Sequence, residues 1–286
     1  MSYAKFLMIA TVMMMGLLSA CNSMKATPVA DPPTLVQHTG KFVWHELLTP
    51  DIDSAKSFYA VLLGWTFNAA DNYTVVLNKG KAIAGMVPLE ADSGQALEAR
   101  WLASLSVADL EKATAAATSA GGIIHEGPRV IENRGRYAFV SDPGGAQLIL
   151  LRAGSGDPDD SEPEIGAWLW DELWTDDTAA AIQFYQDIVG YNTIADNSDY
   201  NIAVNQDIWR AGIRPMPIKG MSPRWIPVIR VKDPEATAKR AEKLGGHVLL
   251  APDQTVASAK VALIADPTGA VFMVQAWSGA LLAVTE

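Results

Sequence analysis

The sequence predicts an α+β fold made of four βαβββ modules, arranged as two similar domains. Two observations lead to this prediction. One long stretch of sequence occurs twice with its motifs in the same order, and within each copy the hydrophobic pattern changes twice from strand to helix to strands. With 286 residues, of which 49% are hydrophobic and 19% charged, the chain is long enough to bury two cores of common size.

The repeat is visible in short motifs that recur at a nearly constant spacing. Residues 42–49 (FVWHELLT) are similar to residues 168–175 (WLWDELWT), which lie 126 residues later. The Phe-Tyr pair at 58–59 recurs at the same offset. Later motifs, such as Arg100-Trp101 and its counterpart Arg224-Trp225, are offset by 124 residues. The two copies therefore differ by one short loop deletion.

The first half of each copy reads as strand, helix and three strands. In copy one, residues 42–49 form a short β-rich run, and residues 51–63 place their large apolar side chains on one helical face. An aspartate precedes this helix and Gly64 follows it, as suits the two ends of a helix. Strands around residues 65–67, 73–77 and 82–87 complete the first module.

The second half repeats the same order. A strand at residues 101–107 leads to a helix at 109–119, which Gly121-Gly122 stops. A strand starts at Ile123, and strands at 137–140 and 146–151 flank an Asp-Pro-Gly-Gly turn. Copy two follows the same pattern, which gives four modules in all.

The N-terminus predicts export and lipid attachment. Lys5 precedes an apolar run at residues 6–18, which is too short to span a bilayer, so residues 1–20 are interpreted as a signal peptide. Leu18-Ser19-Ala20-Cys21 resembles the bacterial lipobox, in which the cysteine sulfur accepts a diacylglycerol. Cys21 is also the only cysteine, which excludes an intrachain disulfide. No aspartate follows it, and this resembles lipoproteins sorted to the outer membrane, here facing the periplasm.

The remaining boundaries follow from composition. Residues 21–40 are expected to form a flexible tether, 41–152 the first domain, 153–165 a linker, 166–278 the second domain and 279–286 a C-terminal tail. Without Lys5 the mature part has a formal charge of −11, which repels phosphate backbones and anionic head groups. We therefore expect no nucleic-acid partner and contact with the membrane only through the lipid. Because four modules can complete their own sites, a monomer is preferred.

The motifs together resemble one known family. The pattern Asp-x-Asp-x-Ala-x-x-Phe-Tyr-x-x-x-Leu-Gly-Trp at residues 51–65 and the Asp-Pro-x-Gly turn before the last strand resemble the glyoxalase/bleomycin resistance/dioxygenase, or vicinal oxygen chelate (VOC), superfamily. The Trp-x-Glu-Leu-x-Thr motif on each first strand is similar to its tandem form. The resemblance implies that paired modules curl their mixed sheets into a half-open cup that holds the active site.

The same resemblance locates the positions at which family enzymes bind a metal. They fall on the first and last strands of the modules, where His, Gln or Glu would be required. In this sequence those positions hold apolar side chains, namely Trp44, Leu102, Ile149, Trp170, Ile226 and Met273. The sequence therefore predicts that the chain has no metal site of the family type and needs no cofactor.

The cup strands carry instead a glutamate between aromatic residues. Alternation along a strand puts Trp44 and Glu46 on one face in copy one, and Trp170, Glu172 and Trp174 on one face in copy two. These five residues are the predicted ligand-binding set, although core packing is the preferred explanation of the tryptophans. The two glutamates are also secondary candidates for a catalytic base, because partial burial raises a carboxyl pKa.

Several neighbouring residues have competing interpretations. An ion pair is favoured over catalysis for each glutamate, with Arg100 and Arg224 as the expected partners. His45 is expected to point to the helix side of its sheet, and His125 is interpreted as a surface residue.

Three functions compete. The first is an envelope-anchored protein that binds a small apolar or aromatic compound without the family metal. The second is a metal-dependent enzyme of the glyoxalase or dioxygenase type with a non-standard site, and the third is a protein-interaction module. A filled cup around Trp44 and Glu46 would favour interaction, whereas convergence of His45, Glu46 and His125 would favour an enzyme.

Overall fold

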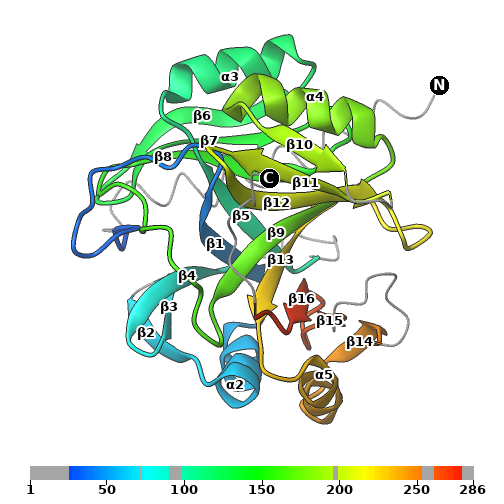
Figure 1. Cartoon of the computed structure of the whole chain (residues 1–286). Helices are drawn as coiled ribbons and strands as arrows, with labels where there is room; N and C mark the ends of the chain where they lie inside the picture. The colour runs from blue at the N-terminus through cyan, green and yellow to red at the C-terminus, as the bar shows by residue number, and fades with distance from the viewer. Residues whose placement is uncertain (1–25, 71, 90–97, 196–198, 253–260, 279–286) are drawn as a thin grey trace, which may run out of the picture.

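The computed structural model describes residues 26–70, 72–89, 98–195, 199–252 and 261–278 (Figure 1). The predicted signal peptide, Cys21 and the C-terminal tail lie outside these ranges. Within them, no helix has the length and apolar character needed to cross a membrane.

The first copy folds into one eight-stranded sheet with the order β2-β3-β4-β1-β5-β8-β7-β6. The first module supplies β1 (Phe42–Thr49), α2 (Ile52–Leu63), β2 (Thr66–Ala70), β3 (Tyr73–Asn78) and β4 (Lys81–Pro88). The second supplies β5 (Arg100–Ser106), α3 (Leu110–Ser119), β6 (Ile123–Ile131), β7 (Gly135–Ser141) and β8 (Gln147–Ala153). The two modules meet where β1 pairs antiparallel with β5.

The second copy repeats this topology in a second eight-stranded sheet, β10-β11-β12-β9-β13-β16-β15-β14. Its third module contains β9 (Trp168–Thr175), α4 (Thr178–Val189), β10 (Asn192–Ala195), β11 (Asn201–Asn205) and β12 (Ile208–Pro215). The fourth contains β13 (Arg224–Arg230), α5 (Pro234–Lys243), β14 (His247–Leu250), β15 (Val261–Ala265) and β16 (Val271–Gln275).

The structure confirms the predicted α+β fold of four βαβββ modules, and most element ends lie within two residues of the predicted ones. The caps explain this accuracy for the helices. Asp51 accepts a hydrogen bond from the Ser54 backbone N–H, and Gly64 ends α2 with a φ of 75°, which favours glycine. Asp177 and Gly190 do the same for α4.

The helices lie between the two sheets, in two pairs that each combine the copies. In Figure 1, α3 lies beside α4 at the top and α2 lies near α5 at the bottom, in agreement with their contacts. Each pair belongs to a hydrophobic core shared by both copies. We call the opposite side of each sheet its cup face. The two cup faces therefore point away from each other.

The motifs that define the repeat hold the two domains together. The Tyr59 hydroxyl in α2 donates to Asp266, in the Asp-Pro turn of copy two, at 3.1 Å. The Tyr185 hydroxyl in α4 donates to Asp142, in the corresponding turn of copy one, at 3.2 Å. All four groups are buried, so each copy's helix is fastened to the other copy's turn.

At the centre of the interface, equivalent positions of the two first strands meet. His45 points away from the cup face, as predicted, and its Nε2 lies 2.9 Å from Oδ1 of Asp171. Asp171 replaces His45 in copy two, and both side chains are almost fully buried. Two histidines or two aspartates at this place would lack a complementary charge, so the two copies differ where they contact each other.

The segment before β1 differs from the flexible tether expected there. Residues 26–38, which we call the strap, lie against the first domain, and Ala26, Val29 and Ala30 are buried. Val29 packs in the apolar cluster on the cup face of the first sheet. The strap also forms backbone hydrogen bonds with residues 155–157, which follow β8. The free energy gained from apolar burial and these hydrogen bonds offsets the conformational entropy that the segment loses when it docks.

Candidate functional site

On the cup face of the first sheet, Glu46 lies in a polar network. Its Oε1 accepts hydrogen bonds from Trp44 Nε1 at 2.8 Å and from the Tyr73 hydroxyl at 2.9 Å. Arg134 adds an ion pair at 3.5 Å and places its guanidinium 3.8 Å from the centre of a Trp44 ring. Burial raises the pKa of Glu46, and Arg134, Tyr73 and Trp44 partly oppose that rise.

The second sheet repeats this arrangement around Glu172. Trp174 Nε1 donates to Oε1 at 2.6 Å, the Tyr200 hydroxyl donates to Oε2 at 3.1 Å, and Arg214 lies 3.9 Å away. Burial again raises the pKa of the carboxyl group, against the effects of Trp174, Arg214 and Tyr200. The tyrosine fits because Gly212 is opposite Glu172, and a Cβ there would lie 2.0 Å from the tyrosine oxygen.

The ion-pair partners predicted for the two glutamates were wrong. Glu46 is directly opposite Leu102, whereas Arg100 is opposite Leu48, further along the strand pair. Arg134 reaches Glu46 instead from the turn between β6 and β7. Arg100 has no ion pair within the described residues.

In copy two the expected partner, Arg224, lies 3.6 Å from Glu98 of copy one. Glu172 has Arg214 as its neighbour, on the adjacent strand β12.

Both cup faces are filled by the chain itself. On the first sheet, Val29 of the strap packs with Leu48, Leu102 and Ile149. On the second sheet, the space over Ile226 and Met273 is covered by apolar residues that follow the strands, namely Met216, Ile218, Met221 and Trp277. Trp44 and Trp174 are 1% exposed, which favours core packing over a ligand wall for these two tryptophans.

The cup faces do not fit the metal that the family resemblance implies. The side chains at the expected ligand positions are apolar, and Leu102 and Ile149 share one buried cluster with the strap. In the described parts of the chain, no three His, Cys, Asp or Glu residues converge on a common point suited to a metal ion. His45 faces the domain interface, and His125 lies on β6, 2.9 Å from the Ser141 hydroxyl.

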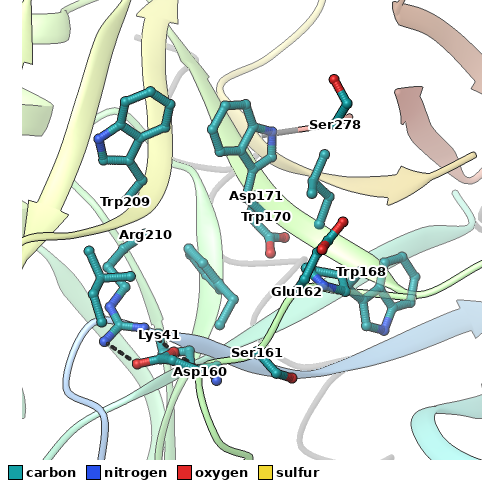
Figure 2. Close-up of a pocket in the computed structure, with 14 residues that line it drawn as sticks. Lys41, Asp160, Ser161, Glu162, Trp168, Trp170, Asp171, Trp209, Arg210 and Ser278 are labelled. Carbon is teal, nitrogen blue, oxygen red and sulfur yellow. Dashed lines mark hydrogen bonds and ion pairs between the residues drawn. The ribbon is translucent and has the colours of Figure 1, made fainter. Parts of the chain in front are cut away.

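A cavity of about 380 Å³ lies at the junction of the two domains, outside the polar networks around Glu46 and Glu172 (Figure 2). We call it the junction cavity. Its walls come from the start of β1, the linker at residues 160–163, and the starting ends of β9 and β12. Four aromatic side chains line it: Phe42, Trp168, Trp170 and Trp209.

The aromatic walls are supported from behind. Trp168 Nε1 donates to the Ile83 carbonyl at 2.9 Å, and its ring centre lies 4.1 Å from that of His45. Trp277 packs against both Trp170 and Trp209, with ring centres 5.5 and 6.1 Å away. These contacts hold the indole rings in place before any ligand arrives.

A charged group lies opposite Trp170 and Trp209 in Figure 2. Arg210 binds both oxygens of Asp160, at 2.6 and 3.0 Å, and the Lys41 amine lies 3.0 Å from the same carboxylate. Burial alone would raise the pKa of Asp160, but the bonds from Arg210 and Lys41 outweigh it and lower the pKa to about 2. Two cations thus share one carboxylate at this wall. The other two carboxylates that line the cavity have partners of their own, Arg230 for Glu162 and His45 for Asp171.

The predicted binding residues are therefore separated by the structure. Trp170 lines the junction cavity, whereas Trp44, Glu46, Glu172 and Trp174 belong to the two filled cup faces.

Lys41, Asp160, Trp209 and Arg210 were missed, because they come from the first residue of the first domain, the linker and the start of β12. The only signal for them was the surplus of tryptophans, nine in all.

Comparison with known proteins places both halves of the chain in one group. Residues 36–150 match the model of the Glyoxalase/Bleomycin resistance protein/Dioxygenase superfamily, and residues 170–275 match that of a Glyoxalase-like domain. The two matches do not overlap, and each covers one of the eight-stranded sheets.

Curated relatives are similar over most of their length. The putative glyoxylase CFP32 of Mycobacterium tuberculosis is 29% identical over 243 residues, which cover 81% of this chain and 92% of the relative. The anthracycline biosynthesis protein DnrV of Streptomyces peucetius is 28% identical over 258 residues, with coverages of 82% and 92%.

Solved structures share the fold. The Mn(II)-bound glyoxalase from Novosphingobium aromaticivorans aligns with a TM-score of 0.63 at 15% identity, over 87% of this chain and 86% of the other. A variant of homoprotocatechuate 2,3-dioxygenase from B. fuscum aligns with a TM-score of 0.59 at 13% identity, over 91% of this chain and 74% of the other. At these identities the likeness concerns the fold alone.

Proposed function

Because the chain belongs to the glyoxalase/bleomycin resistance/dioxygenase superfamily, as two tandem domains, we propose that it binds a small aromatic compound in the junction cavity without the family's metal. The observation that carries this proposal is the cavity itself, in which indole rings form one wall and the group of Lys41, Asp160 and Arg210 forms another.

The size and lining of the cavity support a small organic ligand. Its volume of about 380 Å³ lies at the lower end of the range typical of ligand pockets, roughly 300–1,000 Å³. Trp168, Trp170 and Trp209 offer flat apolar surfaces to a ring system, and stacking adds about 0.5–1.5 kcal/mol to the burial of apolar area.

The charged wall supports a ligand with an acidic or acceptor group. Lys41 and Arg210 both lie at this wall, and Arg210 Nε is buried without a hydrogen-bond partner among the described residues. A carboxylate or phenolate at this wall would meet two cations that share a single carboxylate. We therefore favour an aromatic acid over a neutral aromatic compound.

The relatives are compatible with this class of ligand. One is named for anthracycline biosynthesis and another as a putative glyoxylase. A metal-dependent reaction has less support, since the positions that would hold the metal are apolar and packed.

The proposal is tested by calorimetric titration of the full chain in detergent, with naphthoate as the probe and naphthalenemethanol as its neutral counterpart. We expect one naphthoate per chain, bound more tightly than the alcohol. Trp209→Ala should weaken naphthoate about tenfold or more, because losing one aromatic wall removes about 1.5 kcal/mol or more.

Two matched variants provide the control. Ile208 lines the cavity, whereas Ile194 on the edge strand β10 is 47% exposed. Ile208→Trp should obstruct the cavity and abolish binding, and Ile194→Trp should leave it unchanged. If both variants bind naphthoate like the unaltered chain, or if no aromatic compound binds at all, the proposed site is wrong.

We also propose that the chain is an outer-membrane lipoprotein, attached through Cys21 and facing the periplasm as a monomer. The lipobox resemblance at residues 18–21 supports the attachment. The completeness of both sheets within one chain supports the monomer. Sedimentation of the purified chain with its lipid removed would reveal a dimer if one formed.

A further inference from the structure

We infer that the strap, residues 26–38, is a built-in occupant of the first cup face, and that its docking holds one wall of the junction cavity in place. The first half of this inference stands on the contacts of the strap alone. The second half, which concerns the cavity, rests on the proposed function.

The apolar contacts of the strap place it where the family fold would hold a ligand. Val29 is 6% exposed and packs in one cluster with Leu102 and Ile149, two of the positions at which the family resemblance puts metal ligands. Ala26 and Ala30, on either side of it, are also buried. A segment with small side chains thus fills the space that a separate compound would need.

Arg134 fastens the strap to the polar network on the same face. Its Nε donates to the Thr27 carbonyl at 2.7 Å, while its Nη2 donates to the Tyr73 hydroxyl at 3.1 Å. The same guanidinium lies over Trp44 and forms an ion pair with Glu46. The strap therefore supplies a hydrogen-bond acceptor that a buried arginine requires.

Beyond Ala30 the strap pairs with the linker that follows β8. Ala30 N–H donates to the Ser155 hydroxyl at 3.0 Å, and the N–H groups of Thr34 and Leu35 donate to the Ser155 carbonyl at 2.9 and 3.0 Å. Asp157 continues the pairing, because it accepts a hydrogen bond from His38 N–H at 2.6 Å. These contacts tie the strap to the linker along its length.

Both paired segments then continue into the junction cavity. The strap leads to Lys41 and Phe42, and the linker leads to Asp160 and Glu162, all of which line the cavity. Lys41 also donates to the Pro158 carbonyl at 2.6 Å, so the last bonds of the pairing lie at the cavity wall. Release of the strap would free both segments and loosen that wall.

The experiment uses the full chain in detergent and compares two charge substitutions in the strap. Val29→Asp places a carboxylate in the apolar cluster and should release the strap. Leu35→Asp adds the same charge at a side chain that is 77% exposed and should not. Amide hydrogen exchange at Ala30, Thr34 and Leu35 measures the release. Ser155→Ala is a milder variant that removes the bond from Ala30 N–H together with the bond that the Ser155 hydroxyl donates to the Gly156 carbonyl.

In the unaltered chain these amides should be protected. Val29→Asp should speed their exchange about tenfold or more, Leu35→Asp should leave the other two unchanged, and Ser155→Ala should affect chiefly Ala30. Unprotected amides in the unaltered chain, or equal exchange in Val29→Asp, would overturn the docked strap. Unchanged circular dichroism shows that the variants remain folded.

The link to the cavity is measured by naphthoate titration of the same proteins. Val29→Asp should raise the Kd of naphthoate at least about threefold, and Leu35→Asp should not change it. If the strap is released while the Kd stays the same, the coupling is refuted and the docked strap stands. If the unaltered chain binds no naphthoate, the proposed function fails, and hydrogen exchange still decides whether the strap docks.

Discussion

The buried pair of His45 and Asp171 offers the sharpest test of how the two domains are joined. The side chains are 1% and 0% exposed, and His45 Nε2 lies 2.9 and 3.0 Å from the two carboxylate oxygens. Removal of one partner of such a pair typically costs about 3–5 kcal/mol, because the other polar group stays buried without compensation. That loss is a large part of the roughly 5–15 kcal/mol that stabilises a typical domain.

The decisive perturbation exchanges the two residues. His45→Asp alone brings two carboxylates together and Asp171→His alone brings two imidazoles together, so each should destabilise the chain by about 3 kcal/mol or more. The double variant His45→Asp/Asp171→His restores a complementary pair at the same place, with the two residues exchanged between the copies. It should recover at least about half of the summed loss, since neighbouring residues couple rather than add.

Full recovery is not expected, because the surroundings of the two positions differ. The His45 ring lies against Trp168, whose counterpart in the other copy is Phe42, and Phe42 packs against Trp225. Urea unfolding followed by far-ultraviolet circular dichroism gives the free energies. If the double variant is no more stable than the single ones, the complementarity of His45 and Asp171 does not stabilise the domain interface.

Three further predictions concern other parts of the chain. Burial raises the pKa of Glu172 above its ordinary 4.5, so the folded state binds the proton more tightly than the unfolded state does. The free energy of unfolding should therefore fall as pH rises through the raised pKa. Urea unfolding at a series of pH values should show a smaller fall for Glu172→Gln than for the unaltered chain. Tyr185→Phe removes the hydroxyl that accepts from Trp225 Nε1 at 2.8 Å and donates to Asp142, and should cost about 2–3 kcal/mol by thermal unfolding; no loss would contradict a role in docking. Cys21→Ser should move the chain from the membrane fraction and remove the acyl mass from the N-terminal peptide, and unchanged fractionation would count against lipid attachment.

The fold could be predicted because local signals and the repeat agree. Asp51 and Gly64 mark the ends of one helix, Asp177 and Gly190 mark those of its counterpart, and the hydrophobic period changes between them. What the sequence left open was the pairing of modules. Each sheet combines consecutive modules, while each helical core combines one module from each copy, and such long-range choices leave little trace in local pattern.

The site was predicted less well, for a physical reason. Periodicity correctly placed Trp44 and Glu46 on one face and His45 on the other, because a strand alternates its side chains. Periodicity could not show that the ion-pair partner of Glu46 is Arg134, from a turn distant in sequence, and not Arg100. Nor could it show that the segment expected to be a tether covers that face. In the sequence Val29 is one apolar residue in a linker, and only the structure shows that it packs in a buried cluster.

The repeat itself explains where function should be sought in this chain. Residues kept in both copies, such as Tyr59 and Tyr185, fasten helices to turns, and the paired Glu-Trp motifs pack within closed faces. The charged wall of the junction cavity depends instead on residues without a like counterpart: Lys41 aligns with an alanine, and Asp160 belongs to the linker. Features that both copies share serve the folding of each domain and the packing of the two domains against each other. Binding needs a place where the copies differ, and the charged wall opposite Trp170 and Trp209 is such a place.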